Sequence, residues 1–243
     1  MAIILSGDFH GNECHEMTAI NTKTMKSFCS TKSVNYDDIK YHIILGDVGI
    51  LFPNSWKEDM YNIEFFNSKP FITLGVLGNH ENYSAIEQLP LVDIGIGNPV
   101  WQVSEKLYYM PRGKIYNIDG KKCLVLGGAL SLDKEFRTEF VSWWKKEEWG
   151  YLETEDLLTL LKTENEFDYV FSHSAPVEAG KYLGKFKGYN GLPIDITNGL
   201  DTTVKLNSAV YSMIKFKHWF FGHYHVRFTE DEFSCLYKNL EIV

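Results

Sequence analysis

The feature that most constrains the fold is a short apolar run that ends in glycine and a polar side chain, and this feature recurs. The runs are residues 3–5, 41–45 and 71–77, followed by Gly-Asp-x-His-Gly at 7–11, Gly-Asp at 46–47 and Gly-Asn-His-Glu at 78–81. Trp56, Met60 and Ile63 have helical spacing between the second and third runs. This layout predicts strand–helix–strand units with a site at the carboxyl ends of parallel strands.

Asp8 and His10 follow the first run and set the chemistry of that site. In an extended chain, residues i and i+2 point to the same side, so the two side chains are expected to converge. Divalent metals accept a mixed carboxylate and imidazole pair. Taken alone, the two residues could equally serve a turn or cap a helix, so the other strand ends decide between these interpretations.

Metal-type donors recur just past apolar runs. Five of the eight histidines have this position, and three oxygen donors share it: His10, His80, His173, His223 and His225, with Asp8, Asp47 and Asn79. His15, His42 and His218 lack the context and are interpreted as ordinary surface or strand histidines. Core strands have no need to end in metal-type donors, so the joint pattern predicts a metal centre.

Composition sets the broad class. The chain has 243 residues, 44% of them hydrophobic and 23% charged, which is enough for a full core and argues against disorder. Without repeats or linkers, one domain over residues 1–243 is expected, with a possible cap segment at about 131–150. The net charge of −8 gives no footprint for nucleic acid or an anionic membrane, although a nucleotide substrate stays possible because bound metals reverse the local field.

The cysteines and the apolar runs bear on location. Four scattered cysteines without a Cys-x-x-Cys pair favour reduced thiols. The first residues lack the pattern of a signal peptide, and no apolar run approaches the roughly 20 residues of a membrane helix. A cytoplasmic protein without a membrane partner is expected.

Local patterns predict several further elements. A helix is expected over 54–67 with Asn54 as its cap, a weaker one around 13–29, one capped by Thr154, and one over 203–216. Strands are expected in 101–126, with a hairpin turn at Asp119-Gly120, and at 168–171, 217–221 and 228–243. Residues 180–200 are expected to form a surface loop.

The order of the motifs resembles that of the calcineurin-like metallophosphoesterases. Asp-x-His, Gly-Asp, Gly-Asn-His-Glu, a lone histidine and Gly-His-x-His occur in sequence across residues 7–225. The resemblance implies an α/β (α+β) fold, a four-layer αββα sandwich of two mixed sheets with helices outside. It also implies a two-metal centre of Mn, Fe, Zn or Ni at the strand ends.

The resemblance assigns roles residue by residue. It places Asp8, His10 and His225 on one metal, Asn79, His173 and His223 on the other, and Asp47 on both. A hydroxide between the metals would attack phosphorus, with His80 as the general acid. Glu81 either accepts a hydrogen bond from His80, as a further catalytic group, or is a solvated loop carboxylate.

The sequence departs from the Ser/Thr phosphoprotein phosphatases after its second motif. Those enzymes continue with Asp-Arg-Gly, whereas Asp47 is followed by the apolar residues 48–52. A replacement cation could come from residues 127–137, a Gly-Gly-Ala-x-Ser-x-Asp-Lys-x-x-Arg run that resembles a bacterial and phage subset of the family. Arg137 suits bidentate phosphate contact, or is an ordinary surface arginine. Asn12 either touches substrate, as Asn79 would, or caps a helix.

These inferences predict a metal-dependent hydrolase of phosphomonoesters or phosphodiesters. A small phosphoester of nucleotide type is favoured as substrate, with a Ser/Thr phosphoprotein phosphatase as the alternative. A non-catalytic interaction scaffold on the same fold is the alternative from another class, and the retention of every donor argues against it.

Overall fold

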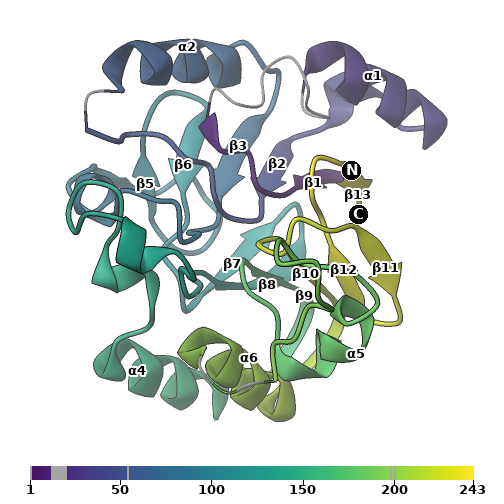
Figure 1. Cartoon of the computed structure of the whole chain (residues 1–243). Coiled ribbons are helices and arrows are strands. Elements are labelled where there is room, and N and C mark those ends of the chain that lie inside the picture. The colour runs from purple at the N-terminus through teal and green to yellow at the C-terminus, as the bar shows by residue number, and fades with distance from the viewer. Residues whose placement is uncertain (1, 12–20, 54, 198, 200) are drawn as a thin grey trace.

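Two β-sheets face each other in the computed structural model, which describes residues 2–11, 21–53, 55–197, 199 and 201–243 (Figure 1). The strands of the first sheet are β1 (Ile3–Ser6), β2 (Tyr41–Ile44), β3 (Ile72–Gly75), β4 (Leu91–Val92), β5 (Val100–Gln102), β6 (Leu107–Tyr109) and β13 (Glu241–Ile242). Their order is β13-β1-β2-β3-β6-β5-β4. The pairs from β1 to β6 are parallel and the outer pairs antiparallel, so the sheet is mixed.

The second sheet is mixed as well. Its strands are β7 (Lys114–Ile118), β8 (Lys121–Leu126), β9 (Glu166–Ser172), β10 (Lys215–Phe221), β11 (Phe228–Glu230) and β12 (Phe233–Cys235). They lie in the order β11-β12-β10-β9-β8-β7, and β8, β9, β10 and β12 are mutually parallel. The predicted turn joins β7 to β8, and Asp119 and Gly120 both have the positive φ that a two-residue hairpin turn requires.

Helices cover the outer faces of both sheets. They are α1 (Thr22–Thr31), α2 (Trp56–Asn67), α3 (Tyr83–Ile86), α4 (Tyr151–Leu161), α5 (Gly180–Leu183) and α6 (Thr202–Met213), with 3-10 turns η2 (Tyr36–Asp38), η3 (Lys134–Phe136), η4 (Lys145–Glu147) and η5 (Val177–Ala179). α1 and α2 pack on the first sheet, whereas α4 and α6 pack on the second (Figure 1). The predicted four-layer αββα sandwich is confirmed.

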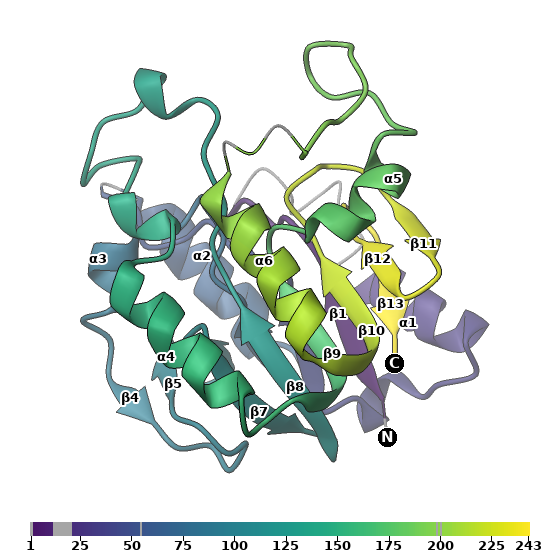
Figure 2. The same ribbon diagram turned by 90° about the horizontal axis from the view of Figure 1, so that it is seen from below.

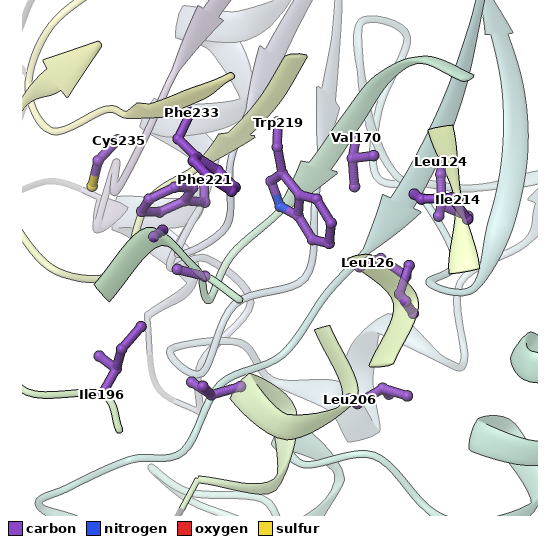
Figure 3. Packing of buried hydrophobic residues seen from close by; sticks show 14 of the residues in the cluster. Leu124, Leu126, Val170, Ile196, Leu206, Ile214, Trp219, Phe221, Phe233 and Cys235 are labelled. Carbon is purple, nitrogen blue, oxygen red and sulfur yellow. The ribbon is translucent and has the colours of Figure 1, made fainter. Parts of the chain in front are cut away.

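Alternate residues of the central strands serve two different cores. In β10, Phe220 packs between the sheets, whereas Trp219 and Phe221 pack toward the helices (Figure 3). In β2, Ile43 and Ile44 divide in the same way. Burial on both faces explains why these strands read as continuous apolar runs. Each such side chain contributes about 1.5–3 kcal/mol by leaving water, and the central strands are thereby fixed in position.

The structure does not begin helices α2 and α4 with the caps predicted from the sequence. Asn54 lies outside the described residues, and the position before α2 is held by Ser55. The prediction of Thr154 as a cap is wrong, because α4 begins three residues earlier, after Gly150. The carboxylate of Glu153 accepts a hydrogen bond from the backbone N–H of Gly150, so the first-turn acid stabilises an earlier start than the apolar pattern indicated.

The remaining expectations concern cysteines, the 13–29 helix and membranes. Cys29, Cys123 and Cys235 are free and buried, and Cys14 lies outside the described residues. α1 covers only the later part of the expected 13–29 helix, since residues 12–20 are not described. In the part of the chain that the structure describes, no helix combines the length and the apolar character needed to cross a bilayer.

Candidate metal centre

The predicted donor side chains follow the carboxyl ends of five parallel strands. Asp8 and His10 follow β1, Asp47 follows β2, Asn79 and His80 follow β3, His173 follows β9, and His223 and His225 follow β10. β1, β2 and β3 are adjacent in the first sheet, and β9 and β10 are adjacent in the second. Because parallel strands end at the same edge of a sheet, both sheets deliver donors to one place.

One group of donors is Asp8, His10 and His225. Their ligand atoms all lie within 4.8 Å of one another. The Nε2 atoms of His10 and His225 are 3.2 Å apart, and Nε2 of His225 is 3.7 Å from Oδ1 of Asp8. The Asp8 carboxylate is fully buried, whereas the two imidazoles are partly exposed. The group therefore opens to solvent on its imidazole side.

A second group adjoins the first. Oδ1 of Asn79 lies 3.0 Å from Nε2 of His173 and 3.1 Å from Nδ1 of His223. Oδ1 of Asp47 is 3.2 Å from Nε2 of His173, and its Oδ2 is 3.7 Å from Nε2 of His10. Asp47 thus lies between the two groups, and the structure brings all seven predicted ligands together.

The backbone reaches this arrangement differently from the sequence prediction. Asp8 and His10 were expected in extended conformation, which is wrong: β1 ends at Ser6, and both residues are left-handed, with φ of 54° and 52°. Asp47, His223 and His225 share that conformation. It costs of the order of 1–3 kcal/mol for each non-glycine residue, and such strain clusters at functional sites.

The glycines of the motifs make room for the donors. A Cβ on Gly46 would lie 2.2 Å from Nδ1 of His173, and one on Gly78 would lie 2.1 Å from Oδ1 of Asp47. Either contact is impossible without moving a donor. The recurring glycine is therefore a packing requirement of the centre as well as a turn residue.

Hydrogen bonds outside the centre orient the donors. Nδ1 of His173 lies 2.7 Å from the carbonyl oxygen of Leu45, and it is the donor because a carbonyl oxygen only accepts. This hydrogen bond orients the ring so that its Nε2 faces Asp47 and Asn79. The backbone N–H of His223 donates to the Asp8 carboxylate at 3.0 Å, and that of His80 to Asp47 at 2.8 Å. These hydrogen bonds hold the donor side chains in their orientations.

The electrostatics of the centre favour a cation. Burial, reinforced by the nearby Asp47 charge, raises the pKa of Asp8 to about 8 against the lowering effect of His173. Burial lowers the pKa of His223 to about 3, which favours the neutral ring. For His173 the lowering effect of burial is outweighed by the Asp47 carboxylate, which raises the pKa to about 9. A metal ion would replace the proton on His173. Carboxylate oxygen, amide oxygen and neutral imidazole nitrogen are the donors that Mn, Fe, Zn and Ni accept. The residues present fit the metals that the motifs imply.

Glu81 does not have the partner predicted for it. The predicted hydrogen bond with His80 is not formed, and the carboxylate is fully buried rather than solvated. It accepts from the backbone N–H groups of Val48 and Gly49 and from the hydroxyl of Tyr109. The chain turn after Asn79 directs Glu81 into the first sheet, where it holds the loop after Asp47.

Arg137 comes to the centre from the predicted cap segment. Its Nη2 lies 2.7 Å from Nε2 of His80 and 2.9 Å from Asp133, and its side chain is 10% exposed. A guanidinium only donates, so Nε2 of His80 accepts this hydrogen bond. Arg137 is thus no ordinary surface arginine. Asn12, the other predicted substrate contact, lies outside the described residues.

Sequence reasoning missed several neighbours of the donors. Tyr237 stacks on the ring of His225 at 4.4 Å, and the hydroxyl of Tyr189 is hydrogen bonded to its Nδ1. Ser131 receives a hydrogen bond from Asn79. The sequence signals for these residues are the Gly-Tyr-Asn-Gly turn at 188–191 and the Gly-Gly-Ala-x-Ser run. Neither pattern indicates which donor the residue contacts.

Comparison with known proteins agrees with this fold. The family model described as calcineurin-like phosphoesterase matches residues 1–227. No curated protein matches the chain. A solved structure described as a putative 5′-nucleotidase from Staphylococcus aureus, in complex with alpha-ketoglutarate, has a similar fold, with a TM-score of 0.52 and 14% identity. The match covers 99% of this chain and 50% of that one, so this chain spans about half its length.

An αββα sandwich with this donor cluster at its strand ends defines the class of metal-dependent phosphoesterases. The chain belongs to the calcineurin-like phosphoesterase family.

Proposed function

We propose that this chain hydrolyses a small phosphoester of nucleotide type with two metal ions. The observation that carries the proposal is the convergence of seven donors from five strand ends. One ion would be held by Asp8, His10 and His225, the other by Asn79, His173 and His223, with Asp47 shared. Bound there, two such cations supply the positive charge that polarises a phosphate and activates water.

His80 and Arg137 supply the remaining polar groups. Arg137 holds the phosphate oxygens through its planar fork of donors. His80, which follows Asn79, would give a proton to the leaving oxygen. In the structure its Nε2 accepts from Arg137, and burial, with the Arg137 charge adding to it, lowers its pKa. His80 would therefore take up that proton when a phosphate replaces it as the partner of Arg137. Nη2 of Arg137 and Nε2 of His80 are 2.7 Å apart. This distance supports the proposal, because a phosphate bound by Arg137 would also lie against the His80 ring.

The surroundings support a small substrate with an aromatic part. Figure 2 shows that the segment around η3 and the segment after α5 project past the strand ends on either side. They expose Phe136, Phe140 and Tyr189, and aromatic rings of this kind stack on a nucleobase. A phosphoprotein substrate has less support, since residues 48–52 contain no arginine and Val48 and Ile50 are buried.

Activity with added Mn²⁺ tests the reaction class. The protein should hydrolyse p-nitrophenyl phosphate or its bis-ester, and both EDTA and Asp47→Asn should abolish the reaction. Asp156→Asn, a matched change at an exposed residue of α4, should leave it intact. Activity that survives chelation, or survives Asp47→Asn, would contradict the two-metal site.

A substrate panel tests the substrate class. Rates should be compared for a mononucleotide, 2′,3′- and 3′,5′-cyclic nucleotides, bis-p-nitrophenyl phosphate and a phosphopeptide. We expect the highest kcat/KM for a nucleotide, and the order of mononucleotide and cyclic nucleotides gives the ester preference. Preference for the phosphopeptide would support a phosphoprotein phosphatase instead.

A further inference from the structure

A buried chain of hydrogen bonds leads from the donor Asn79 into the cap segment. Nδ2 of Asn79 lies 3.0 Å from Oγ of Ser131, and this Oγ lies 2.8 Å from Oε2 of Glu147. The backbone N–H of Ser131 also donates to Oε1 of Glu147, at 2.7 Å. Asn79, Ser131 and Glu147 are 5%, 1% and 0% exposed, so water does not compete for these bonds.

The direction of the chain is set at its far end. A carboxylate only accepts, so the hydroxyl of Ser131 donates its single hydrogen to Glu147. The same oxygen must then accept from Asn79, which requires the NH₂ end of the amide to face Ser131. The carbonyl end, Oδ1, is thereby left facing His173 and His223. A cation needs that oxygen, since an amide NH₂ group cannot bind one.

Glu147 is itself held firmly. Arg112, 8% exposed, donates to the carbonyls of Glu147 and Glu148 at 3.3 and 3.1 Å. A Cβ on Gly128 would lie 2.1 Å from the Glu147 carbonyl oxygen, and φ of Gly128 is +85°. The absence of a side chain at Gly128 therefore lets the Glu147 segment pack against the end of β8. This packing explains why the Gly-Gly-Ala-x-Ser run has a glycine at this position.

We propose that Ser131 and Glu147 are positioning residues that fix the Asn79 amide with its oxygen toward one of the two metals. The inference rests on the two-metal function proposed above. It further implies that the cap segment is part of the metal centre, and that its effect is selective. Oδ1 of Asn79 lies against His173 and His223. The metal that these two histidines would hold should therefore depend on Ser131, whereas the metal on Asp8, His10 and His225 should not.

Calorimetric titration of the metal-free protein with Mn²⁺ tests the selectivity. Ser131→Ala and Glu147→Gln should each lower the Mn²⁺ affinity of one of the two sites by about 10–100-fold and leave that of the other unchanged. This is the usual effect of removing a residue that is hydrogen bonded to a metal ligand. Ser131→Thr keeps the hydroxyl and should restore the affinity. The matched control is Ser84→Ala, because Ser84 accepts a hydrogen bond from Trp144 of the same segment but is not bonded to Asn79.

Three results would overturn the proposal. Unchanged affinities in Ser131→Ala would deny Ser131 its role. An equal loss at both sites, together with a lower Tm of the metal-free variant, would reveal a merely structural effect. Failure of the wild-type protein to bind Mn²⁺ would instead overturn the two-metal function, and this positioning role with it.

The wild-type protein offers a second measurement in case the variants do not fold. In nuclear magnetic resonance spectra of the metal-free protein, the side-chain amide protons of Asn79 should show Overhauser contacts to the β protons of Ser131. Contacts from these protons only to the rings of His173 and His223 would mean the opposite amide orientation. That result would overturn the proposal without any variant or metal.

Discussion

His80 and Arg137 face each other at the edge of the candidate metal centre, where a phosphate would enter. Asp133 pairs with Arg137 at 2.9 Å, which leaves the guanidinium with donors to spare. Arg137 comes from a segment 57 residues after His80 in the chain. At the residue scale, the fold brings a cation from a distant segment to His80, although the second motif itself has no arginine.

Arg137→Ala is expected to lower kcat/KM by about 10–100-fold, as loss of a charge-assisted hydrogen bond of about 1.5–3 kcal/mol would. Arg137→Lys keeps the charge but loses the planar fork, so it should recover only part of the activity. Steady-state kinetics measure both effects, and Mn²⁺ stoichiometry should stay at the wild-type value. Equal rates for all three proteins would deny Arg137 a place in the reaction.

His42 predicts an acid sensitivity that is independent of the metal centre. It is buried, lies 2.8 Å from Oγ of Ser6, and burial, with the Lys69 charge adding to it, lowers its pKa to about 3. The unfolded chain takes up this proton below about pH 6.5, whereas the folded chain does not. Stability is therefore complete above pH 6.5 and is lost as pH falls toward 3.

Guanidinium unfolding at pH 7 and pH 5 measures this effect. The single histidine should remove about 2 kcal/mol of unfolding free energy between these two pH values. In His42→Asn that part of the pH dependence should disappear, although the variant is less stable at pH 7. An identical pH slope in both proteins would mean that His42 takes up its proton in the folded state.

At the scale of elements, α6 shows how a helix on the outer face is held over the second sheet. Its N-cap is Asp201, whose side chain accepts from the backbone N–H groups of Thr203 and Val204 at 2.8 and 3.2 Å. Val204 and Val210 are buried against the sheet. The cap accepts hydrogen bonds from two backbone N–H groups of the first turn, which have no partner within the helix.

Asp201→Ala should therefore destabilise the protein by about 1 kcal/mol, the usual effect of losing an N-cap side chain. Asp201→Asn keeps an acceptor oxygen and should lose much less. Chemical denaturation of the three proteins at neutral pH measures the difference. An alanine variant as stable as the wild type would show that packing alone holds the start of α6.

At the scale of the whole molecule, the candidate centre links the two sheets. Asp8, Asp47 and Asn79 come from the first sheet, whereas His173 and His223 come from the second. The centre buries the carboxylates of Asp8 and Asp47 between the two sheets. A bound cation would offset the free-energy cost of burying these charges and would hold both sheets together.

Mn²⁺ should therefore stabilise the entire fold. At a concentration of 100 Kd, binding to one site raises the free energy of unfolding by about 2.7 kcal/mol. A calorimetric scan should show a higher Tm with Mn²⁺. EDTA should reverse the increase, and Asp8→Asn, which loses one of the two proposed sites, should show a smaller one. Asp156→Asn should respond as the wild type does. A Tm indifferent to Mn²⁺ would place metal binding, if any, away from the folded core.

The sequence by itself determined the class of fold and the donors. Apolar runs ending in glycine and a polar residue predicted strands and their carboxyl-end site, because residue type and spacing are local properties. The structure brings together all seven predicted ligands, from Asp8 to His225. Their assignment to two metals stays a prediction from the motif order.

Tertiary structure alone decided how the donors are held. The left-handed backbone at Asp8, the burial of Glu81 away from His80, and the link from Asn79 through Ser131 to Glu147 were not readable from the sequence. Each depends on partners far apart in the chain, such as Asn79 and Ser131, 52 residues apart. Local patterns specify which groups a site contains, whereas packing between distant segments specifies which way each group points.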